Sequence, residues 1–293
     1  MRTIDPKITP TKDVHQYLLG AVAPRPIALV STIDEDGTPN LAPYSFYNAF
    51  SSNPPIVVFS SNRKLKDNAT KDTLFNVRNT GEVVINAVNY DIVRQMTIAS
   101  IEYPAKVSEF EKSGLTPIPS DEVAPFRVKE SPVHLECKVQ EVIPLGTQGG
   151  AGHLIICKVV KIHVSEAILD EDHKINPHKI DLMGRMGRAF YVRASGEAVM
   201  TIMQPVNKIG IGYEALPLSA RESTVLTGND LGRLAGLEHP PSKREIEAAK
   251  THEFVKNLLG TPNALTNLHK RAQIELAKEN VALAAAIVWL GEQ

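Results

Sequence analysis

The sequence predicts a mainly β protein with some α: a six-stranded antiparallel β-barrel with a C-terminal helical extension. Three observations support this fold class. The first two-thirds of the chain holds six short apolar runs, some of which alternate as half-buried strands do. The helical patterns between them are too few and too short for a doubly wound parallel sheet. From about residue 220 the pattern becomes helical. Closing six strands into a small barrel removes exposed strand edges.

The first three strands are expected at residues 26–32, 40–46 and 54–61. Asp36-Gly37 gives the turn signal between the first two. Pro43 confines the second strand to an edge or a bulge, because proline cannot donate to the ladder. The third strand has an unbroken apolar centre and is expected to be buried on both faces. The long connection from the first strand to the third is expected to follow an irregular path with many free backbone N–H groups.

The other elements of this region are a helix over 66–81, a strand over 82–88, a short helix over 89–100, and strands over 132–146 and 153–169. Asp72 or Thr70 is expected to cap the first helix, and Gly81 to end it. Asn89 or Asp91 is expected to cap the second.

Two helices are expected near the C-terminus, over 240–260 and from 261 to the end. Ser242 and Glu245 form a capping box, and Gly260 ends the first helix. Thr261 and Pro262 then provide an N-cap followed by proline at the first helical position. One apolar stripe runs along the last helix: Ala277, Val281, Ala284 and Val288. This stripe must cover either the barrel or a second subunit.

The composition indicates a soluble globular protein, with 293 residues, 43% hydrophobic and 22% charged, and a net charge of -1. A charge so near neutrality gives no sign of nucleic-acid or membrane binding. The N-terminus has no apolar signal-peptide core, and no apolar run reaches the roughly 18 residues of a membrane span. Cys137 and Cys157 are expected to be buried thiols in a reducing cytoplasm, with a disulfide or redox pair as the alternative.

Common catalytic motifs are missing from the sequence, among them the P-loop, the HExxH metal motif and the GxSxG nucleophile elbow. The glycine-rich stretch 146–152 lacks the dinucleotide spacing and leads into a strand. It is expected to be a flexible hairpin loop or, alternatively, a loop that closes over a ligand. His173 and His178 lie in a charged loop, where no metal site is expected. The hard chemistry of an enzyme of this kind would belong to a bound cofactor.

Residues 31–50 combine polar and aromatic side chains that suit a planar ring with a polar rim. The polar ones are Ser31, Thr32, Asn40, Ser45 and Asn48, and the aromatic ones are Tyr44, Phe46, Tyr47 and Phe50. The next stretch carries hydroxyls, cations and a helix start, which suit a phosphate monoester: Ser60, Ser61, Arg63, Lys64, Lys66, Lys71 and Thr73. Together they indicate a phosphorylated aromatic cofactor. The alternative is a set of ordinary turns beside a solvated basic loop.

Three runs, at 23–60, 71–88 and 183–193, resemble the flavin reductase-like family of FMN-binding split barrels. The resemblance covers about residues 15–195. It implies a six-stranded Greek-key split barrel that forms a homodimer, with one FMN per subunit near the dimer interface. It also divides the chain into an FMN-binding domain, 1–195, and an extended linker with a helical appendage, 196–293.

The same resemblance assigns residues around the FMN. Ser31 and Thr32 are placed beside the isoalloxazine, and Pro43, Tyr44, Ser45 and Phe46 along it. Ser60, Ser61 and Arg63 flank the phosphate or the ribityl chain, and Lys71, Asp72 and Thr73 complete the phosphate end. Arg188 is placed at the flavin or at the partner subunit, and Arg25 is expected to brace the barrel.

The implied activity is that of an NAD(P)H:flavin oxidoreductase, in which hydride passes from the nicotinamide C4 to the flavin N5. This step needs no general acid, in keeping with the missing catalytic motifs. Three alternatives remain: a non-enzymatic FMN electron-transfer protein like flavoredoxin, reduced by a partner protein; an FMN-dependent oxidoreductase on an organic substrate, its pocket shaped by the C-terminal helices; or a split barrel with another cofactor, such as haem.

Overall fold

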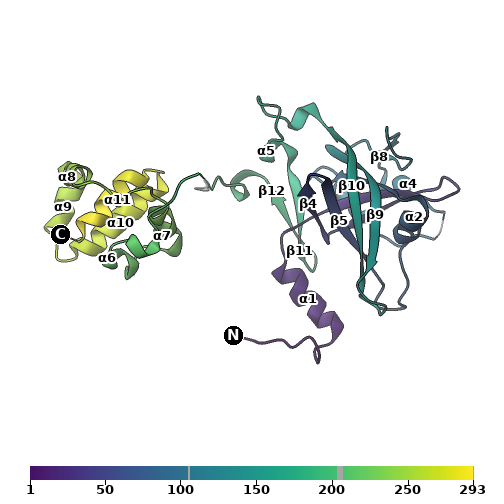
Figure 1. Cartoon of the computed structure of the whole chain (residues 1–293), viewed down its shortest axis with the longest axis horizontal. Helices are drawn as coiled ribbons and strands as arrows, with labels where there is room; N and C mark the ends of the chain where they lie inside the picture. The colour runs from purple at the N-terminus through teal and green to yellow at the C-terminus, as the bar shows by residue number, and fades with distance from the viewer. Residues whose placement is uncertain (105, 203–206, 293) are drawn as a thin grey trace. The chain divides into compact units, whose positions relative to one another are not determined.

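The computed structural model describes residues 1–104, 106–202 and 207–292 (Figure 1). The chain divides into two compact units, Met1–Met200 and Thr201–Gln293. The first unit is built around β-strands, and the second is helical (Figure 1). Within the described ranges, no helix is both long enough and apolar enough to cross a lipid bilayer.

A seven-stranded antiparallel sheet forms the barrel, in the order β3-β2-β6-β9-β10-β5-β4. Its strands are β2 (Ala28–Ile33), β3 (Pro39–Tyr44), β4 (Tyr47–Ser52), β5 (Pro55–Asn62), β6 (Glu82–Ala87), β9 (Val133–Pro144) and β10 (Gly152–Val164). The two outermost strands, β3 and β4, are consecutive in the chain, and Ser45 and Phe46 alone join them. The Ser60 N–H donates to the Phe46 carbonyl at 2.8 Å, which extends the pairing of β4 with β5 as far as this link.

All six predicted strands are present, and Pro43 lies on an edge strand as expected. The prediction of an irregular connection from the first strand to the third was wrong, because β4, a strand that was not predicted, follows β3 after two residues. Strand β4 is almost entirely exposed, and its register against β5 shifts between Ala49 and Ser51. It therefore lacks the apolar alternation that reveals a half-buried strand in a sequence.

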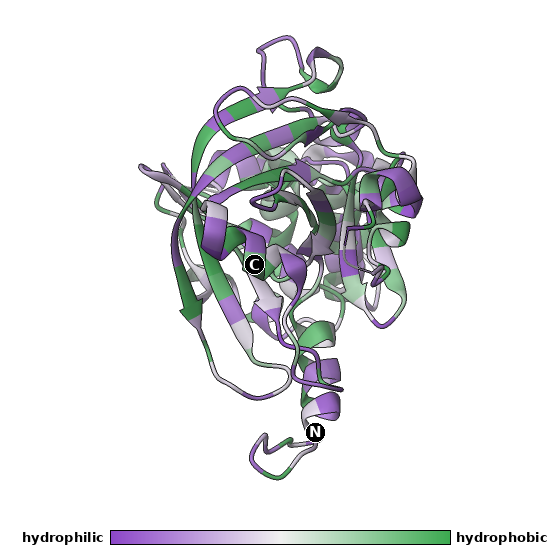
Figure 2. Cartoon of the chain, turned by 90° about the vertical axis from the view of Figure 1, so that its right-hand side faces the viewer, coloured by the Kyte–Doolittle hydropathy of each residue, from purple (hydrophilic) through white to green (hydrophobic). Residues whose placement is uncertain are grey.

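The barrel interior is filled by inward-facing side chains, among them Val30, Phe59 and Ile155. Along the long strands, hydrophobic and hydrophilic residues alternate (Figure 2). Cys137 and Cys157 lie in this interior as free thiols, as predicted. Burial raises the pKa of the Cys157 thiol to about 12, so this thiol stays protonated and unreactive at neutral pH.

Among the described residues of this unit, five α-helices and two small sheets lie around the barrel. The helices are α1 (Thr11–Ala21), α2 (Asp72–Thr80), α3 (Val93–Ile98), α4 (Glu109–Ser113) and α5 (Pro177–Ile180). One small sheet joins β1 (Arg25–Pro26), β11 (Leu182–Gly187) and β12 (Phe190–Ala194), and the other joins β7 (Pro117–Ile118) and β8 (Arg127–Val128). Helix α1 was not predicted.

Helix α2 starts at Asp72, later than expected, and Gly81 ends it in the left-handed region at φ 67°, as predicted. The predicted side-chain caps were wrong for both helices. Lys71 occupies the N-cap position of α2 and Ile92 that of α3, and neither side chain makes a capping hydrogen bond.

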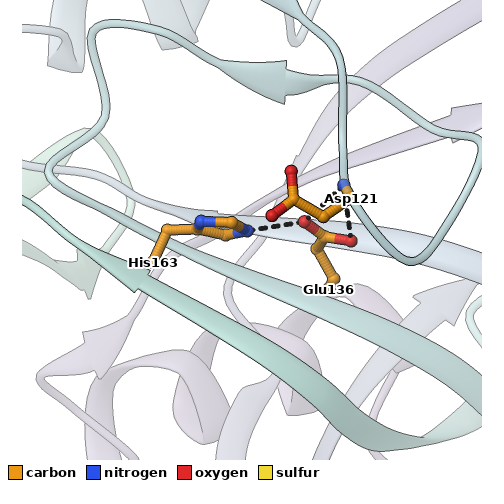
Figure 3. A group of neighbouring side chains, drawn as sticks. All are labelled: Asp121, Glu136 and His163. Carbon is orange, nitrogen blue, oxygen red and sulfur yellow. Dashed lines mark hydrogen bonds and ion pairs between the residues drawn. The ribbon is translucent and has the colours of Figure 1, made fainter.

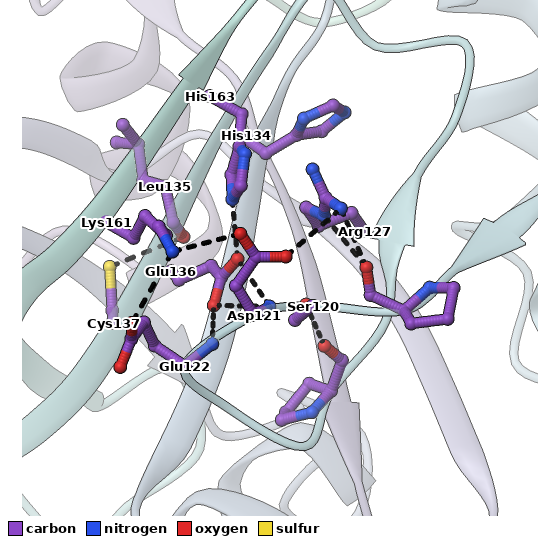
Figure 4. Close-up of polar contacts among 12 residues, drawn as sticks. Ser120, Asp121, Glu122, Arg127, His134, Leu135, Glu136, Cys137, Lys161 and His163 are labelled. Carbon is purple, nitrogen blue, oxygen red and sulfur yellow. Dashed lines mark hydrogen bonds and ion pairs between the residues drawn. The ribbon is translucent and has the colours of Figure 1, made fainter.

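A buried carboxylate fastens the segment before β8 to the sheet (Figures 3 and 4). Glu136 of β9 accepts hydrogen bonds from the Asp121 N–H at 3.0 Å, the Glu122 N–H at 2.6 Å and His163 Nε2 at 2.6 Å. Lys161 Nζ lies 3.0 Å from Asp121. Ligand atoms of Asp121, Glu136 and His163 lie within 4.8 Å of one another, as in a metal site. Here the carboxylate oxygens of Glu136 already accept hydrogen bonds from these N–H groups, and Asp121 is paired with the Lys161 ammonium. The cluster therefore has a structural role, which is to hold this segment against the sheet.

The second unit packs α6 (Leu218–Arg221), α7 (Gly228–Ala235), α8 (Lys243–Thr251), α9 (Glu253–Leu259), α10 (Ala264–Ala277) and α11 (Val281–Leu290) around a core of their own. Ala284 and Val288 of the predicted stripe lie in this core. The expectation that the stripe covers the barrel or a second subunit was therefore wrong, since the stripe packs against helices of its own unit.

The boundaries of these helices differ partly from the prediction. The capping box of Ser242 and Glu245 is present. The first predicted helix is interrupted at His252, where the backbone is extended, and Asn263 rather than Thr261 occupies the N-cap of α10. The last predicted helix is divided after α10, where Glu279 has a left-handed φ of 62°. Its final residue, 293, and residues 203–206 of the predicted linker lie outside the described ranges.

Candidate functional site at the barrel edge

The link between β3 and β4 is braced by a buried arginine. Arg25 Nη1 donates to the Leu19 carbonyl at 2.7 Å and also to the Val22 carbonyl, at the end of α1. Its Nε lies 3.5 Å from Ser45 Oγ, and its guanidinium lies 5.9 Å from the centre of the Phe46 ring. Arg25 thus ties the link to α1, in keeping with the bracing role expected for it.

Polar side chains are linked to one another at the mouth of the barrel. Thr73 Oγ1 donates to Asn40 Oδ1 at 2.8 Å, and Thr32 Oγ1 approaches the same oxygen at 3.3 Å. Asn76 Nδ2 donates to Thr32 Oγ1 at 3.0 Å. Thr32, Thr73 and Asn76 are all buried, which makes these bonds valuable, since an unpaired buried polar group is destabilising.

Glu109 of α4 completes this group from a distant part of the chain. Its Oε2 accepts from the Leu41 N–H at 3.0 Å and from Asn40 Nδ2 at 3.3 Å. Burial raises the pKa of the Glu109 carboxyl, and the bond from the Leu41 N–H only partly offsets that rise. Both polar atoms of the Asn40 amide are therefore hydrogen-bonded, its oxygen to Thr73 and its nitrogen to Glu109. Sequence reasoning missed Glu109 and Asn76, because nothing in the sequence indicates that α4 reaches β3.

Tyr44 lies beneath Lys71 in the same region. The Lys71 ammonium is 5.0 Å from the centre of the Tyr44 ring, and burial lowers the pKa of this lysine. Burial also raises the pKa of Tyr44 to about 12, although the nearby hydroxyls of Thr73 and Ser61 act to lower it. None of these hydroxyls makes a hydrogen bond of good geometry with Tyr44 OH within the described residues. The phenol is therefore neutral at physiological pH.

A first cleft, of about 200 Å³, opens beside these residues at the N-terminus of α2. It is lined by Asn40, Lys64, Lys71, Asp72, Thr73 and Glu109, together with residues 99–103. Lys64 Nζ is paired with Glu102 at 2.8 Å on its rim. The first backbone N–H groups of a helix have no partner within the helix and carry partial positive charge, so this end of α2 favours an anion.

A second cleft, of about 350 Å³ and named the α1 cleft, includes Phe46 of the link in its lining. Phe46, Asn62, Arg63, Leu65 and Gly150 form one wall, and Thr11, Val14, His15 and Leu18 form the other. The structure thus divides the predicted site residues. Lys71, Asp72 and Thr73 line the first cleft, and Phe46 and Arg63 line the α1 cleft.

Four other predicted residues take different positions. Ser60 is buried and donates to Asn62 Oδ1 at 2.9 Å, and the hydroxyl of Ser61 is buried without a hydrogen-bond partner among the described residues. Ser31 is fully buried and lines neither cleft. Arg188 is exposed at φ 49° in the turn after β11, on a separate cleft with Arg2 and Phe190. Within one subunit, the structure does not bring Arg188 to the link.

The glycine-rich stretch between β9 and β10 is held against the chain around Arg63. The Arg63 N–H donates to the Ala151 carbonyl at 2.9 Å, and the Gly150 N–H returns a bond to the Arg63 carbonyl at 3.0 Å. A Cβ on Gly149 would lie 3.0 Å from the Lys64 carbonyl, so a larger residue would push the two segments apart. The expected flexible hairpin loop is thus a hairpin loop fixed by backbone bonds, and it positions Arg63.

The first strand residues after this stretch also contribute to the site. His153, which sequence reasoning missed, is buried and donates from Nδ1 to the Ser61 carbonyl at 3.1 Å. A Cβ on Gly152 would lie 2.5 Å from Ser60 Oγ, so glycine is needed there to leave room for that hydroxyl. Two cationic side chains, a helix N-terminus, hydroxyls and an aromatic wall therefore gather around the link, and this set suits a flat ligand with an anionic group.

Comparison with known sequences identifies this part of the chain. The profile of the flavin reductase like domain matches residues 20–179, whereas the helical unit lies outside that range. An uncharacterized protein of Aquifex aeolicus is 41% identical over 197 residues, which cover 67% of this chain and 97% of that protein.

Solved structures share the fold. Nitrilotriacetate monooxygenase component B from Bacillus cereus superposes with a TM-score of 0.63 at 30% identity, covering 70% of this chain and 98% of that chain. The 2-nitrobenzoate 2-nitroreductase NbaA from Pseudomonas fluorescens gives 0.61 at 26% identity, covering 69% and 96%. A protein with a split barrel domain from Shewanella frigidimarina gives 0.59 at 25% identity, covering 68% and 95%. The chain therefore belongs to the flavin reductase-like family of split-barrel flavoproteins.

Proposed function

We propose that the protein is an oxidoreductase that holds FMN at the barrel edge and oxidises NAD(P)H. One observation carries the proposal: in a chain of this family, Lys71 and the N-terminus of α2 line the first cleft, and the Lys71 ammonium lies 5.0 Å from the ring of Tyr44, the residue before the β3–β4 link. A phosphate needs cations and N–H donors, and a flavin ring needs a flat wall and backbone amides. Both sets are present within a short stretch of surface.

The phosphate end is assigned to Lys71 and the first turn of α2. Because the Thr73 hydroxyl already donates to Asn40, the group that Thr73 offers a phosphate is its backbone N–H. Three carboxylates, Asp72, Glu102 and Glu109, also line this cleft and oppose an anion. Lys64 offsets Glu102, and the raised pKa of Glu109 reduces its negative charge as the pH falls.

The ring is assigned to the link, along Pro43, Tyr44, Ser45 and Phe46, with Ser60 and Arg63 toward the ribityl chain. A bound FMN would supply the redox chemistry, as the acceptor of hydride from a reduced nicotinamide. The link residues would contribute by fixing the position and orientation of the flavin ring for that transfer. Backbone N–H groups of the link stabilise negative charge on the ring, as oriented dipoles do in other sites.

A homodimer in the cytoplasm belongs to the same proposal. Strand β4 is the last strand of the sheet, and Phe50 on it is 68% exposed. A free strand edge with an exposed aromatic side chain is a surface that another chain can cover. Two free, buried thiols suit a reducing compartment. Sedimentation of the purified protein measures the dimer directly, and a monomer at micromolar concentration would refute this part.

The absorption spectrum of purified protein tests the proposal. We expect flavin bands, tighter retention of FMN than of riboflavin, and anaerobic bleaching by NADH or NADPH. Colourless protein that takes up no FMN would overturn the proposal. Bound FMN that bleaches rapidly with a partner reductase but not with either nicotinamide would make the protein an electron carrier.

A further inference from the structure

Helix α1 presents an ordered face to a cleft instead of to a core. Thr11, Val14, His15 and Leu18 follow the spacing that places side chains on one side of a helix, and all four line the α1 cleft. None of the residues of α1 is buried, and Leu18 is 52% exposed. An apolar helix face normally packs against the protein interior, so this one is free to contact a ligand.

The position of α1 is fixed at its C-terminal end. Arg25 donates to two carbonyls there, those of Leu19 and Val22. Gly187 of β11 also approaches closely, since a Cβ at that glycine would lie 3.1 Å from the Leu19 carbonyl. The helix therefore forms a defined wall, and the α1 cleft is a formed feature of the barrel unit.

The α1 cleft combines apolar and aromatic side chains with one cation, and this combination suits a ligand that has both a ring and a negative charge. The His15 ring stands edge-on to the Phe46 ring, at 6.2 Å between centres and 80° between planes. Val14, Leu18 and Leu65 add apolar surface. Arg63 supplies the cation, with Nη1 bound to the Asn68 carbonyl at 2.9 Å and further N–H groups remaining on its guanidinium.

We propose that the α1 cleft binds a single-ring aromatic carboxylate beside the flavin. The ring lies between Leu18 and Phe46, the carboxylate pairs with Arg63, and the His15 ring extends the aromatic wall beside Phe46. A planar guanidinium matches a carboxylate in two parallel bonds. The volume of about 350 Å³ is at the lower end of the range for small-molecule pockets, and it suits one ring rather than a whole dinucleotide.

This inference rests on the proposed function only in placing the flavin next to the cleft, so its test uses calorimetry as well as colour. Benzoate and benzamide are titrated into the full-length protein with and without FMN. We expect benzoate to bind at least tenfold more tightly than benzamide. Benzoate should also perturb the spectrum of any bound flavin.

Two variants of α1 locate the binding. Leu18→Trp fills the cleft and is expected to weaken benzoate binding at least tenfold while FMN is retained. Lys12→Trp adds the same bulk on an exposed part of the helix that lines neither cleft, and should leave both ligands unaffected. Equal benzoate binding by the two variants would overturn the proposal.

Loss of FMN from Leu18→Trp, but not from Lys12→Trp, would show that the α1 cleft is the flavin's own site. That result would overturn the aromatic-acid proposal and leave the proposed function standing. Conversely, protein that binds no flavin but still binds benzoate in a Leu18-dependent way would refute the proposed function and retain the α1 cleft.

Discussion

The barrel unit and the helical unit bury different kinds of side chain. The barrel unit buries many polar groups, and four of them, Thr32, Thr73, Asn76 and Glu109, belong to one hydrogen-bonded group around Asn40. The helical unit buries His269 and Glu275 beside a core of Ala, Leu, Ile and Val. Since a buried polar group requires a partner to be tolerated, the larger polar group in the barrel unit distinguishes the unit that carries the candidate site.

The largest expected effect is on the helical unit alone. Leu276→Ala removes a fully buried side chain and should lower the free energy of unfolding of that unit by about 2–5 kcal/mol. The single tryptophan, Trp289, lies in α11 and reports this unfolding by its fluorescence, whereas bound flavin reports the barrel. Loss of flavin at the same denaturant concentration as the shifted Trp289 transition would show that the two units unfold together.

The second effect is confined to the barrel. The double variant Arg63→Ala/Lys71→Ala should raise the dissociation constant of FMN about a hundredfold or more, because hydrogen bonds to charged groups contribute about 1.5–3 kcal/mol each and about 1.4 kcal/mol corresponds to a tenfold change. The Trp289 transition should not move. Lys66→Ala, an exposed lysine of the same loop, is the matched control. If the double variant without flavin also melts at a clearly lower temperature than the wild type without flavin, the two residues serve the fold and not only FMN binding.

A smaller effect tests a cap in the helical unit. Ser242→Ala removes the side-chain acceptor of a capping box and should destabilise the Trp289 transition by about 1 kcal/mol. Ser242→Asp should restore most of this loss, and the flavin should be retained throughout. No change in the Trp289 transition would show that α8 is held by its packing alone.

The smallest effect depends on pH and has opposite signs in the two units. The raised pKa of Glu109 means that its ionisation destabilises the native barrel at neutral pH, and this penalty disappears as pH falls through the native pKa toward the ordinary 4.5. Glu109→Gln should therefore match or slightly exceed the wild type at pH 7, with the difference shrinking on acidification.

In the helical unit, burial raises the pKa of Asp230, but hydrogen bonds from the Thr227 N–H and Gln273 bring it below its ordinary 3.8. Its contribution to stability is complete above that value and is lost as pH falls below it. Unfolding measured at several pH values, by flavin release and by Trp289 fluorescence, follows both units. If acidification from pH 7 to 4.5 lowered the stability of the wild-type barrel as much as that of the Glu109→Gln variant, the role given to Glu109 would be contradicted.

The sequence predicted what local patterns control. Strands β6, β9 and β10 carry β-branched runs, so their burial could be foreseen. The exposed β4 and the unburied α1 escaped detection, because neither has a face that packs into a core. The stripe on α11 was visible, but a stripe does not specify what covers it. Likewise, the bond from Asn40 to Glu109 joins residues 69 positions apart and leaves no trace in local spacing.

The two-residue link of Ser45 and Phe46 has a consequence for how such a protein can change. Because only this link joins the two outermost strands, which are not hydrogen-bonded to each other, an insertion there would let them move apart and would disturb a ligand bound beside them. New ligand preferences are therefore easier to acquire through substitutions in α1, which leave the link of Ser45 and Phe46 unchanged. A designer seeking altered selectivity would randomise positions 11, 14, 15 and 18 of α1 and leave the link intact.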